Sequence, residues 1–156
     1  MATTVALATL KVTLKEDIVI NGRQQGSETV LSIPSINEIS KRILTAPTSE
    51  IEIIAMSTVV ASGTYIESDV RYIRITNLDD TNHVTLTFKN ENNDEFAVKL
   101  DKGQSFVYNG DLSGGVVDTM DAIDATGLTL SLGDLVNITA LADTAACDLE
   151  VFVASA

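Results

Sequence analysis

Apolar residues in this chain recur at every second position over most of its length. The runs from Leu10 to Leu14 and from Val84 to Phe88 both alternate apolar residues with Thr or Lys. Successive side chains of a β-strand point to opposite faces, so this spacing is typical of strands with one buried face. The sequence therefore predicts an all-β protein.

Short polar turn sequences separate the alternating runs. Asn21-Gly22 tolerates positive φ at both positions and predicts a two-residue hairpin turn. Further polar turns at 79–82, 90–94 and 101–104 predict three hairpin connections in a row. Such connections require antiparallel neighbours, because parallel strands need crossovers of about a dozen residues or more.

Two stretches are harder to interpret. The apolar residues between Val30 and Leu44 suit a helical stripe as well as a strand, but β-branched content and the prolines at 34 and 47 favour a strand. From 109 to 127 the pattern lapses, which predicts a long surface loop with room for one helical turn over 117–123. Residues 128–140 and 147–153 then predict the final strands.

Eight or nine strands at regular spacing predict an antiparallel β-sandwich, jelly-roll-like, with a small barrel as the alternative. A chain of 156 residues, 45% of them hydrophobic, supplies one core. We therefore assign residues 10–156 to a single domain and residues 1–9 to an N-terminal arm or first strand. Residues 1–9 lack the basic region of a signal peptide and are expected to be mature sequence.

The charge balance argues against two classes of partner. The sequence contains ten Lys and Arg residues and 22 Asp and Glu residues, so its net charge is −12. Residues 103–156 contain eight of the acidic residues and no basic one. Binding to a phosphate backbone or to anionic lipid requires clustered Lys and Arg. We therefore expect no nucleic-acid partner and no membrane partner.

The sequence contains few candidates for catalytic residues. His83, the single histidine, adjoins a polar turn, and Cys147 falls in phase with core residues, which predicts a buried and inert thiol. Asp118, Asp121 and Asp124 could be imagined to hold calcium, but their spacing does not match a calcium-binding loop. We therefore expect no enzyme, no metal and no cofactor.

The candidate contact residues lie in the N-terminal segment and among the basic residues. The neutral segment 2–9 could extend as an arm and add a strand to a neighbour, although a first strand of its own sheet or a frayed end explains it equally well. Basic side chains could meet an acidic protein surface, although solvated strand faces explain them equally well. The candidates are Thr3, Val5, Leu7, Thr9, Lys11, Arg42, Arg71 and Arg74.

Three parts of the sequence carry a resemblance to a known group of proteins. They are VRYIRITNLDDTN at 70–82, FAVKL with GQSF at 96–106, and ADTAACDLEVFV at 142–153. These parts resemble small virion structural proteins of tailed bacteriophages, including marine cyanophage types. The resemblance implies a β-rich accessory particle protein, first of all a capsid cement (decoration) protein.

The resemblance also implies where such a protein acts. A cement protein is made in the host cytoplasm, sits on the capsid surface of the virion, contacts the major capsid protein and is often a homo-oligomer, here expected as a trimer. A tail or fibre-associated β-sandwich that binds host carbohydrate is the alternative, with the loop at 109–127 as its ligand edge.

Overall fold

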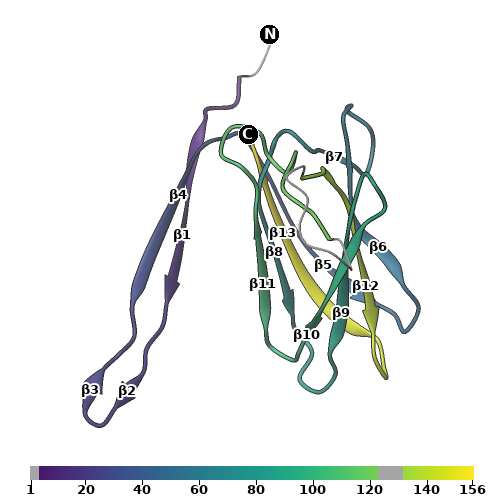
Figure 1. The fold of residues 1–156 in the computed structure, drawn as a ribbon. Helices are drawn as coiled ribbons and strands as arrows, with labels where there is room; N and C mark the ends of the chain where they lie inside the picture. The colour runs from purple at the N-terminus through teal and green to yellow at the C-terminus, as the bar shows by residue number, and fades with distance from the viewer. Residues whose placement is uncertain (1–3, 123–131) are drawn as a thin grey trace.

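The computed structural model describes residues 4–122 and 132–156, and within these residues the chain forms β-strands and no helix (Figure 1). Two packed antiparallel sheets confirm the predicted β-sandwich. The strands are β1 (Ala8–Lys15), β2 (Val19–Ile20), β3 (Arg23–Gln24), β4 (Glu28–Ile36), β5 (Glu38–Ala46), β6 (Ile51–Ser57), β7 (Tyr65–Ile66), β8 (Val70–Asn77), β9 (Val84–Asn90), β10 (Glu95–Leu100), β11 (Ser105–Asn109), β12 (Leu135–Ala142) and β13 (Cys147–Ser155).

The sandwich has the strand order of a jelly roll. One sheet has four strands in the order β11-β8-β13-β5, and the other has five in the order β10-β9-β12-β6-β7. If the eight long strands from β5 to β13 are numbered one to eight along the chain, these orders read 6-3-8-1 and 5-4-7-2. This double-sheet arrangement of eight antiparallel strands is a jelly roll. The short β7 adds to β6 in parallel.

The prediction of three consecutive hairpins is wrong at two of the three turns. The turn at 90–94 joins β9 to β10, which pair from Lys89 opposite Glu95 onward. The turns at 79–82 and 101–104 instead carry the chain across to the facing sheet, because β8 and β11 lie in one sheet and β9 and β10 in the other. A polar turn has the same composition in both cases, so the local pattern cannot distinguish them.

The stretch from Val30 to Leu44 is extended, as predicted, but it forms two strands rather than one. The chain changes direction at Asn37, whose backbone N–H donates to the Ser155 carbonyl at 3.0 Å. Just before this point Ser35 adopts a φ of 63°. As a result β4 leaves the sandwich, whereas β5 forms an edge of the four-stranded sheet.

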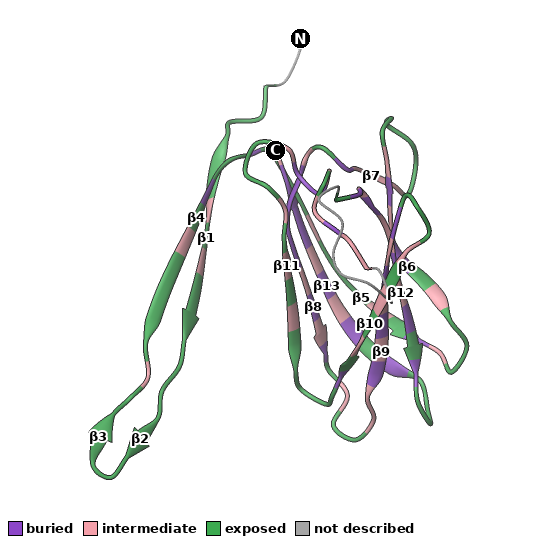
Figure 2. Ribbon diagram, in the orientation of Figure 1, coloured by how far each residue is buried: buried purple, intermediate pink, exposed green. Residues whose placement is uncertain are grey.

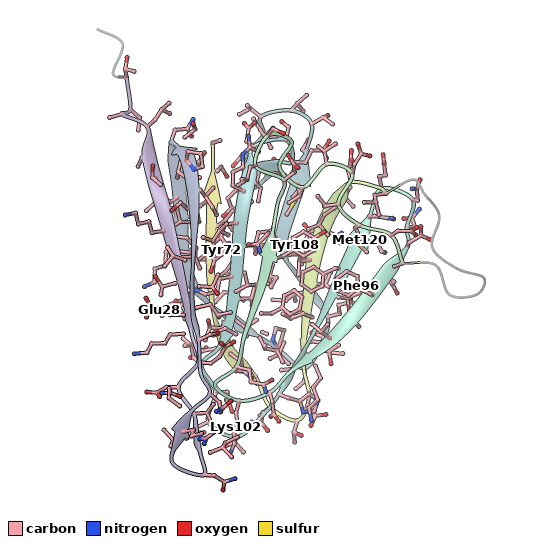
Figure 3. All side chains as sticks on the ribbon, turned by 60° about the vertical axis from the view of Figure 1, so that its left-hand side comes forward. Glu28, Tyr72, Phe96, Lys102, Tyr108 and Met120 are labelled. Carbon is pink, nitrogen blue, oxygen red and sulfur yellow. The ribbon has the colours of Figure 1, made fainter. Side chains whose placement is uncertain are left out.

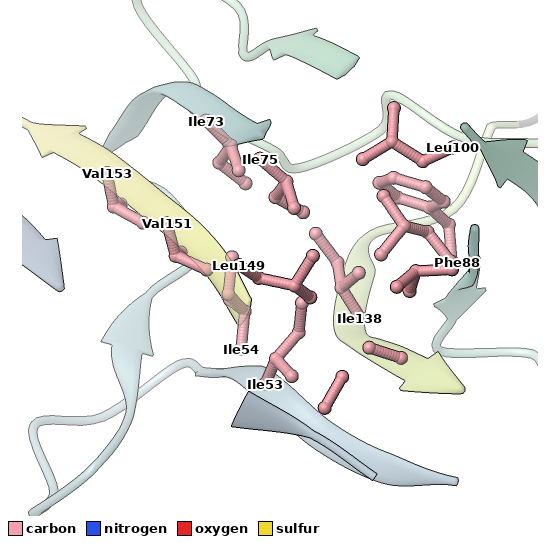
Figure 4. Close-up of a cluster of buried hydrophobic side chains, with 14 of the residues drawn as sticks. Ile53, Ile54, Ile73, Ile75, Phe88, Leu100, Ile138, Leu149, Val151 and Val153 are labelled. Carbon is pink, nitrogen blue, oxygen red and sulfur yellow. The ribbon is translucent and has the colours of Figure 1, made fainter. Parts of the chain in front are cut away.

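The core lies between the two inner faces, as Figure 4 shows. Every second residue of β9 and β13 is buried there, which explains the alternation in the sequence. Phe88 stacks on Phe96 with 4.8 Å between ring centroids and on Tyr108 with 5.7 Å. The other large buried side chains of this core include Ile53, Ile54, Ile73, Ile75, Leu86, Ile138 and Leu149.

The predicted surface loop is partly built into the sandwich. Val116 and Met120 are buried, and the Tyr108 hydroxyl donates to the Thr119 carbonyl at 3.2 Å (Figure 3). The predicted helical turn is absent from 117–122, the described part of that range. The rest of the loop and the predicted strand residues 128–131 lie outside the described residues.

Candidate interaction surface

A long hairpin projects from the sandwich and forms a separate two-stranded sheet (Figure 1). β1 pairs with β4, and β2 pairs with β3 near the tip. The tip turn has φ angles of 52° at Asn21 and 75° at Gly22, which confirms the predicted hairpin turn. The projecting unit runs to Ile36 and is therefore much longer than the arm expected over residues 1–9.

The base of the hairpin packs on the outward face of the four-stranded sheet. Ile33, 1% exposed, and Ile36 form a small cluster with Tyr72 of β8 and Ala154 of β13. Phe152 borders this cluster and meets Tyr72 in a T-shaped ring contact at 6.0 Å. The base of the hairpin therefore covers part of the outward face of β8, the face that carries both the aromatic Tyr72 and the charged Arg74.

The distal half of the hairpin keeps its apolar residues in solvent (Figure 2). Leu14 shares a face with Leu10 and Val12 but is 63% exposed, and Ile18, Val19 and Ile20 near the tip are also exposed. A two-stranded ribbon alone is marginally stable in water. In the described residues β1 and β4 pair only with each other, so their outer edges offer unpaired backbone groups as well.

The outward face of the four-stranded sheet continues this apolar surface. On its edge strand β5, Ile39 is 65% exposed and Ile43 is 64% exposed. Charged side chains on the same face form ion pairs with one another. Glu150 accepts a hydrogen bond from Arg74 at 2.5 Å and lies 3.5 Å from the Lys41 ammonium. The bond from Arg74, helped by Lys41, holds the pKa of Glu150 below its ordinary value.

Four of the predicted contact residues lie on the arm. Val5 and Leu7 are exposed in the segment before β1, and Thr9 and Lys11 are exposed on β1 itself. Thr3 lies outside the described residues. The structure therefore places these four together on one projecting element, and their contact with a partner stays a prediction.

The three predicted arginines lie on the sandwich and bind groups of their own chain. Arg42 donates to the backbone carbonyl of Ile53 and so bridges the two sheets at their open edge. Arg71, 8% exposed, donates to the Ser68 carbonyl at 2.5 Å. Arg74 binds Glu150 and lies over the Phe152 ring, 5.9 Å from its centroid. Arg71 is thus too buried to offer its charge to a partner.

Sequence reasoning missed several strongly exposed apolar residues of this region, among them Leu14, Ile39 and Ile43. Leu14 falls in an alternating run, which predicted burial on the core side of a strand, whereas Ile39 and Ile43 fall in the stretch that suited a helical stripe as well as a strand. For Leu14 one signal was available, the turn at Asn21-Gly22. Such a turn pairs the two strands that flank it and by itself provides no third strand to cover their apolar face. The outward face of β5 carried no such signal.

The candidate nucleophile Cys147 makes its hydrogen bonds to backbone carbonyls and not to the imidazole of His83, the candidate base. The Cys147 thiol is buried and donates to the backbone carbonyls of Ala145 at 3.5 Å and His83 at 3.9 Å, while the His83 imidazole lies 3.7 Å from the Asp143 carboxylate. Burial, followed by the nearby carboxylates of Asp79, Asp148 and Asp143, raises the pKa of this thiol. The prediction of a buried thiol is confirmed.

The acidic residues of the loop do not converge in the described part of the chain. Asp118 donates its backbone N–H to the Asp134 carboxylate at 2.8 Å, whereas Asp124 lies outside the described residues. Within 4–122 and 132–156, no three His, Cys, Asp or Glu side chains form a group that could hold a metal ion. Over the same residues, no helix has the length and apolar character to cross a membrane.

Comparison with known proteins adds little to these observations. No family model matches the chain, and no curated protein matches it. A solved structure from the Bacillus endospore appendages, described as "a novel family of disulfide-linked pili", is similar at 10% identity. The likeness covers 99% of this chain and 95% of that chain with a TM-score of 0.43. A likeness of this size defines neither a family nor a function.

Proposed function

We propose that the protein is a non-enzymatic structural subunit that joins a larger protein assembly through its projecting hairpin. The observation that carries this proposal is the hairpin itself, which holds Leu14, Val19 and Val30 in solvent beyond its base. Leu14 lies on the ribbon face that carries Ile33, and Val30, which pairs with Thr13, lies on the opposite face, so both faces of the hairpin expose apolar residues. Exposed apolar residues gathered on one element of a folded protein mark a site of interaction. Two unpaired ribbon edges add a second means of contact, because an edge strand can accept another strand.

In its specific form, the proposal is a capsid decoration protein of a tailed bacteriophage that contacts the major capsid protein on the virion surface. The support for this form is the sequence resemblance. Two of its three parts, 70–82 and 142–153, contain β8 and most of β13, the two central strands of the four-stranded sheet. The resemblance therefore concerns the frame that carries the hairpin rather than the hairpin itself.

A binding experiment on particles tests the proposal. Purified protein is titrated onto empty capsids that lack it, prepared from a phage whose genome carries this gene. We expect saturable, stoichiometric binding and a higher melting temperature of the capsid. Val19→Asp places a charge on the exposed tip and is expected to weaken binding at least tenfold, because burying an unpaired carboxylate is costly.

The matched control is Ala97→Asp, which places the same charge at an exposed position of β10 on the sandwich. This variant should bind capsids like the wild type. Absence of capsid binding, together with specific capture of the protein on a glycan array, would overturn the decoration proposal in favour of a carbohydrate-binding module.

A further inference from the structure

The hairpin is electrically neutral although the chain is strongly acidic. Residues 4–36 contain three basic side chains (Lys11, Lys15, Arg23) and three acidic ones (Glu16, Asp17, Glu28), so their sum is zero. The whole chain carries −12. The entire net charge therefore belongs to the sandwich that follows, from residue 37 onward.

The outward face of the four-stranded sheet is neutral as well. Its charged side chains, fixed by the pairing of β5, β13 and β8, are Lys41 and Arg74 on the positive side and Asp148 and Glu150 on the negative side. Their sum is also zero. The excess of carboxylates consequently lies on other surfaces of the sandwich.

The hairpin and this face of the sheet already contact each other within one molecule. Ile33 and Ile36 of the hairpin contact Tyr72 and Ala154 of the sheet. Beyond this contact both surfaces continue with exposed apolar side chains, the hairpin with Leu14 and the sheet with Ile39 and Ile43. The intramolecular contact thus covers only part of two surfaces that are alike in polarity and charge.

We propose that a second copy of this chain covers the remainder: the hairpin of each copy lies over the Ile39 and Ile43 side of the neighbouring copy's four-stranded sheet. Such a contact buries apolar residues from both copies at zero net charge and leaves the acidic surfaces, which repel each other, turned away. The contact closes into a small ring of two or three copies. This inference goes beyond the proposed function, since it requires no capsid.

Sedimentation velocity on the purified full chain measures the association. We expect a concentration-dependent dimer or trimer, and we expect Leu14→Asp and Ile43→Asp each to raise its dissociation constant at least tenfold. Both positions are exposed, so the variants should fold, which near-ultraviolet circular dichroism and the melting temperature verify. Ala97→Asp, on the five-stranded sheet, is the control and should associate like the wild type.

Disulfide trapping identifies the contact directly. Leu14→Cys and Ile43→Cys are prepared as separate proteins and mixed under mild oxidation, so that a bond between the two new thiols must join different chains. We expect the mixture to give more cross-linked dimer than either variant alone, and more than a mixture of Leu14→Cys with Ala97→Cys. The native Cys147 is buried and should not contribute.

The salt dependence distinguishes this contact from attraction between opposite charges. Sodium chloride screens the repulsion between acidic bodies, so the neutral apolar contact should strengthen as salt rises. A protein that stays monomeric at all concentrations would overturn the inference. So would association that is unchanged by Ile43→Asp or weakened by salt. None of these results touches capsid binding, which the Val19→Asp experiment tests separately.

Discussion

The side-chain amide of Asn77 donates to the carbonyl oxygen of Leu100 at 3.2 Å and thereby joins the end of β8 to the end of β10 in the facing sheet. The same amide donates to the Asn82 carbonyl at 2.9 Å, and its oxygen accepts the backbone N–H of Asp79 at 3.0 Å. Asn77 is completely buried. One side chain therefore fixes two of the connections that cross between the sheets, the turns at 79–82 and 101–104.

Replacing this side chain should destabilise the whole sandwich. Asn77→Ala removes three hydrogen bonds and leaves buried backbone groups unpaired, which we expect to lower the free energy of unfolding by about 2–4 kcal/mol. Urea unfolding followed by circular dichroism measures the loss. Asn92→Ala, at an exposed position of the turn at 90–94, is the control and should change stability by less than about 0.5 kcal/mol. Equal effects of the two variants would contradict the assigned role.

Ile33→Ala should release the hairpin without unfolding the sandwich. Ile33 is the main buried residue of the small cluster at the base, which is separate from the main core. Elements with few buried contacts open locally at low free energy. We expect faster cleavage within residues 8–36 by a dilute protease and an almost unchanged melting temperature.

The comparison variant is Ile53→Ala in the main core, which should lower global stability by about 2–5 kcal/mol because it creates a cavity. A large drop in melting temperature with Ile33→Ala, similar to that of Ile53→Ala, would show that hairpin and sandwich unfold as one unit.

Glu67→Gln should stabilise the protein at neutral pH. Burial raises the pKa of Glu67, and the negative charges of Asp134 and Glu91 raise it further. Because the folded state holds this proton more tightly than the unfolded state, stability is lost as pH rises through the raised pKa. The variant should therefore be more stable than the wild type at pH 7, with the gain shrinking toward pH 4.

Urea midpoints measured between pH 4 and pH 8 test this prediction. Glu28→Gln, at an exposed position of the hairpin, should leave the profile unchanged. A Glu67→Gln profile parallel to that of the wild type would show that Glu67 titrates normally.

The Cys147 thiol should react only when the chain opens. The thiol is buried, donates to backbone carbonyls and has a raised pKa. Both the access of a reagent to the sulfur and the formation of the thiolate are therefore suppressed. We expect labelling by a thiol-reactive chromogenic disulfide to be slow in the native protein and fast in urea. Rapid labelling under native conditions, at a rate independent of urea, would contradict this assignment.

Most strand positions were predictable because burial alternates locally along each strand. The run from Val84 to Phe88 lies within β9, and the run from 147 to 153 lies within β13. The turn at Asn21-Gly22 was predictable for a similar reason, since it depends on the φ preference of two adjacent residues. The buried state of Cys147 followed from its phase alone.

The candidate surface was much less predictable. Arg71 and Arg74 look alike in the sequence, yet one is buried against Ser68 and the other sits on the outward face with Glu150. Leu14 and Leu86 follow the same alternation, yet Leu14 is exposed on a ribbon and Leu86 is in the core. Alternation reports that a strand has an apolar face, and it does not report what covers that face.

The sequence by itself determined that this chain is extended, where most of its strands and tight turns fall, and that residues 103–156 contain acidic side chains and no basic one. Only the tertiary structure decided which turns cross between sheets, and that the first thirty or so residues leave the sandwich with part of their apolar face uncovered. The physical reason is that strand alternation and turn propensity depend on neighbours in the chain, whereas strand pairing and burial depend on residues far away in sequence.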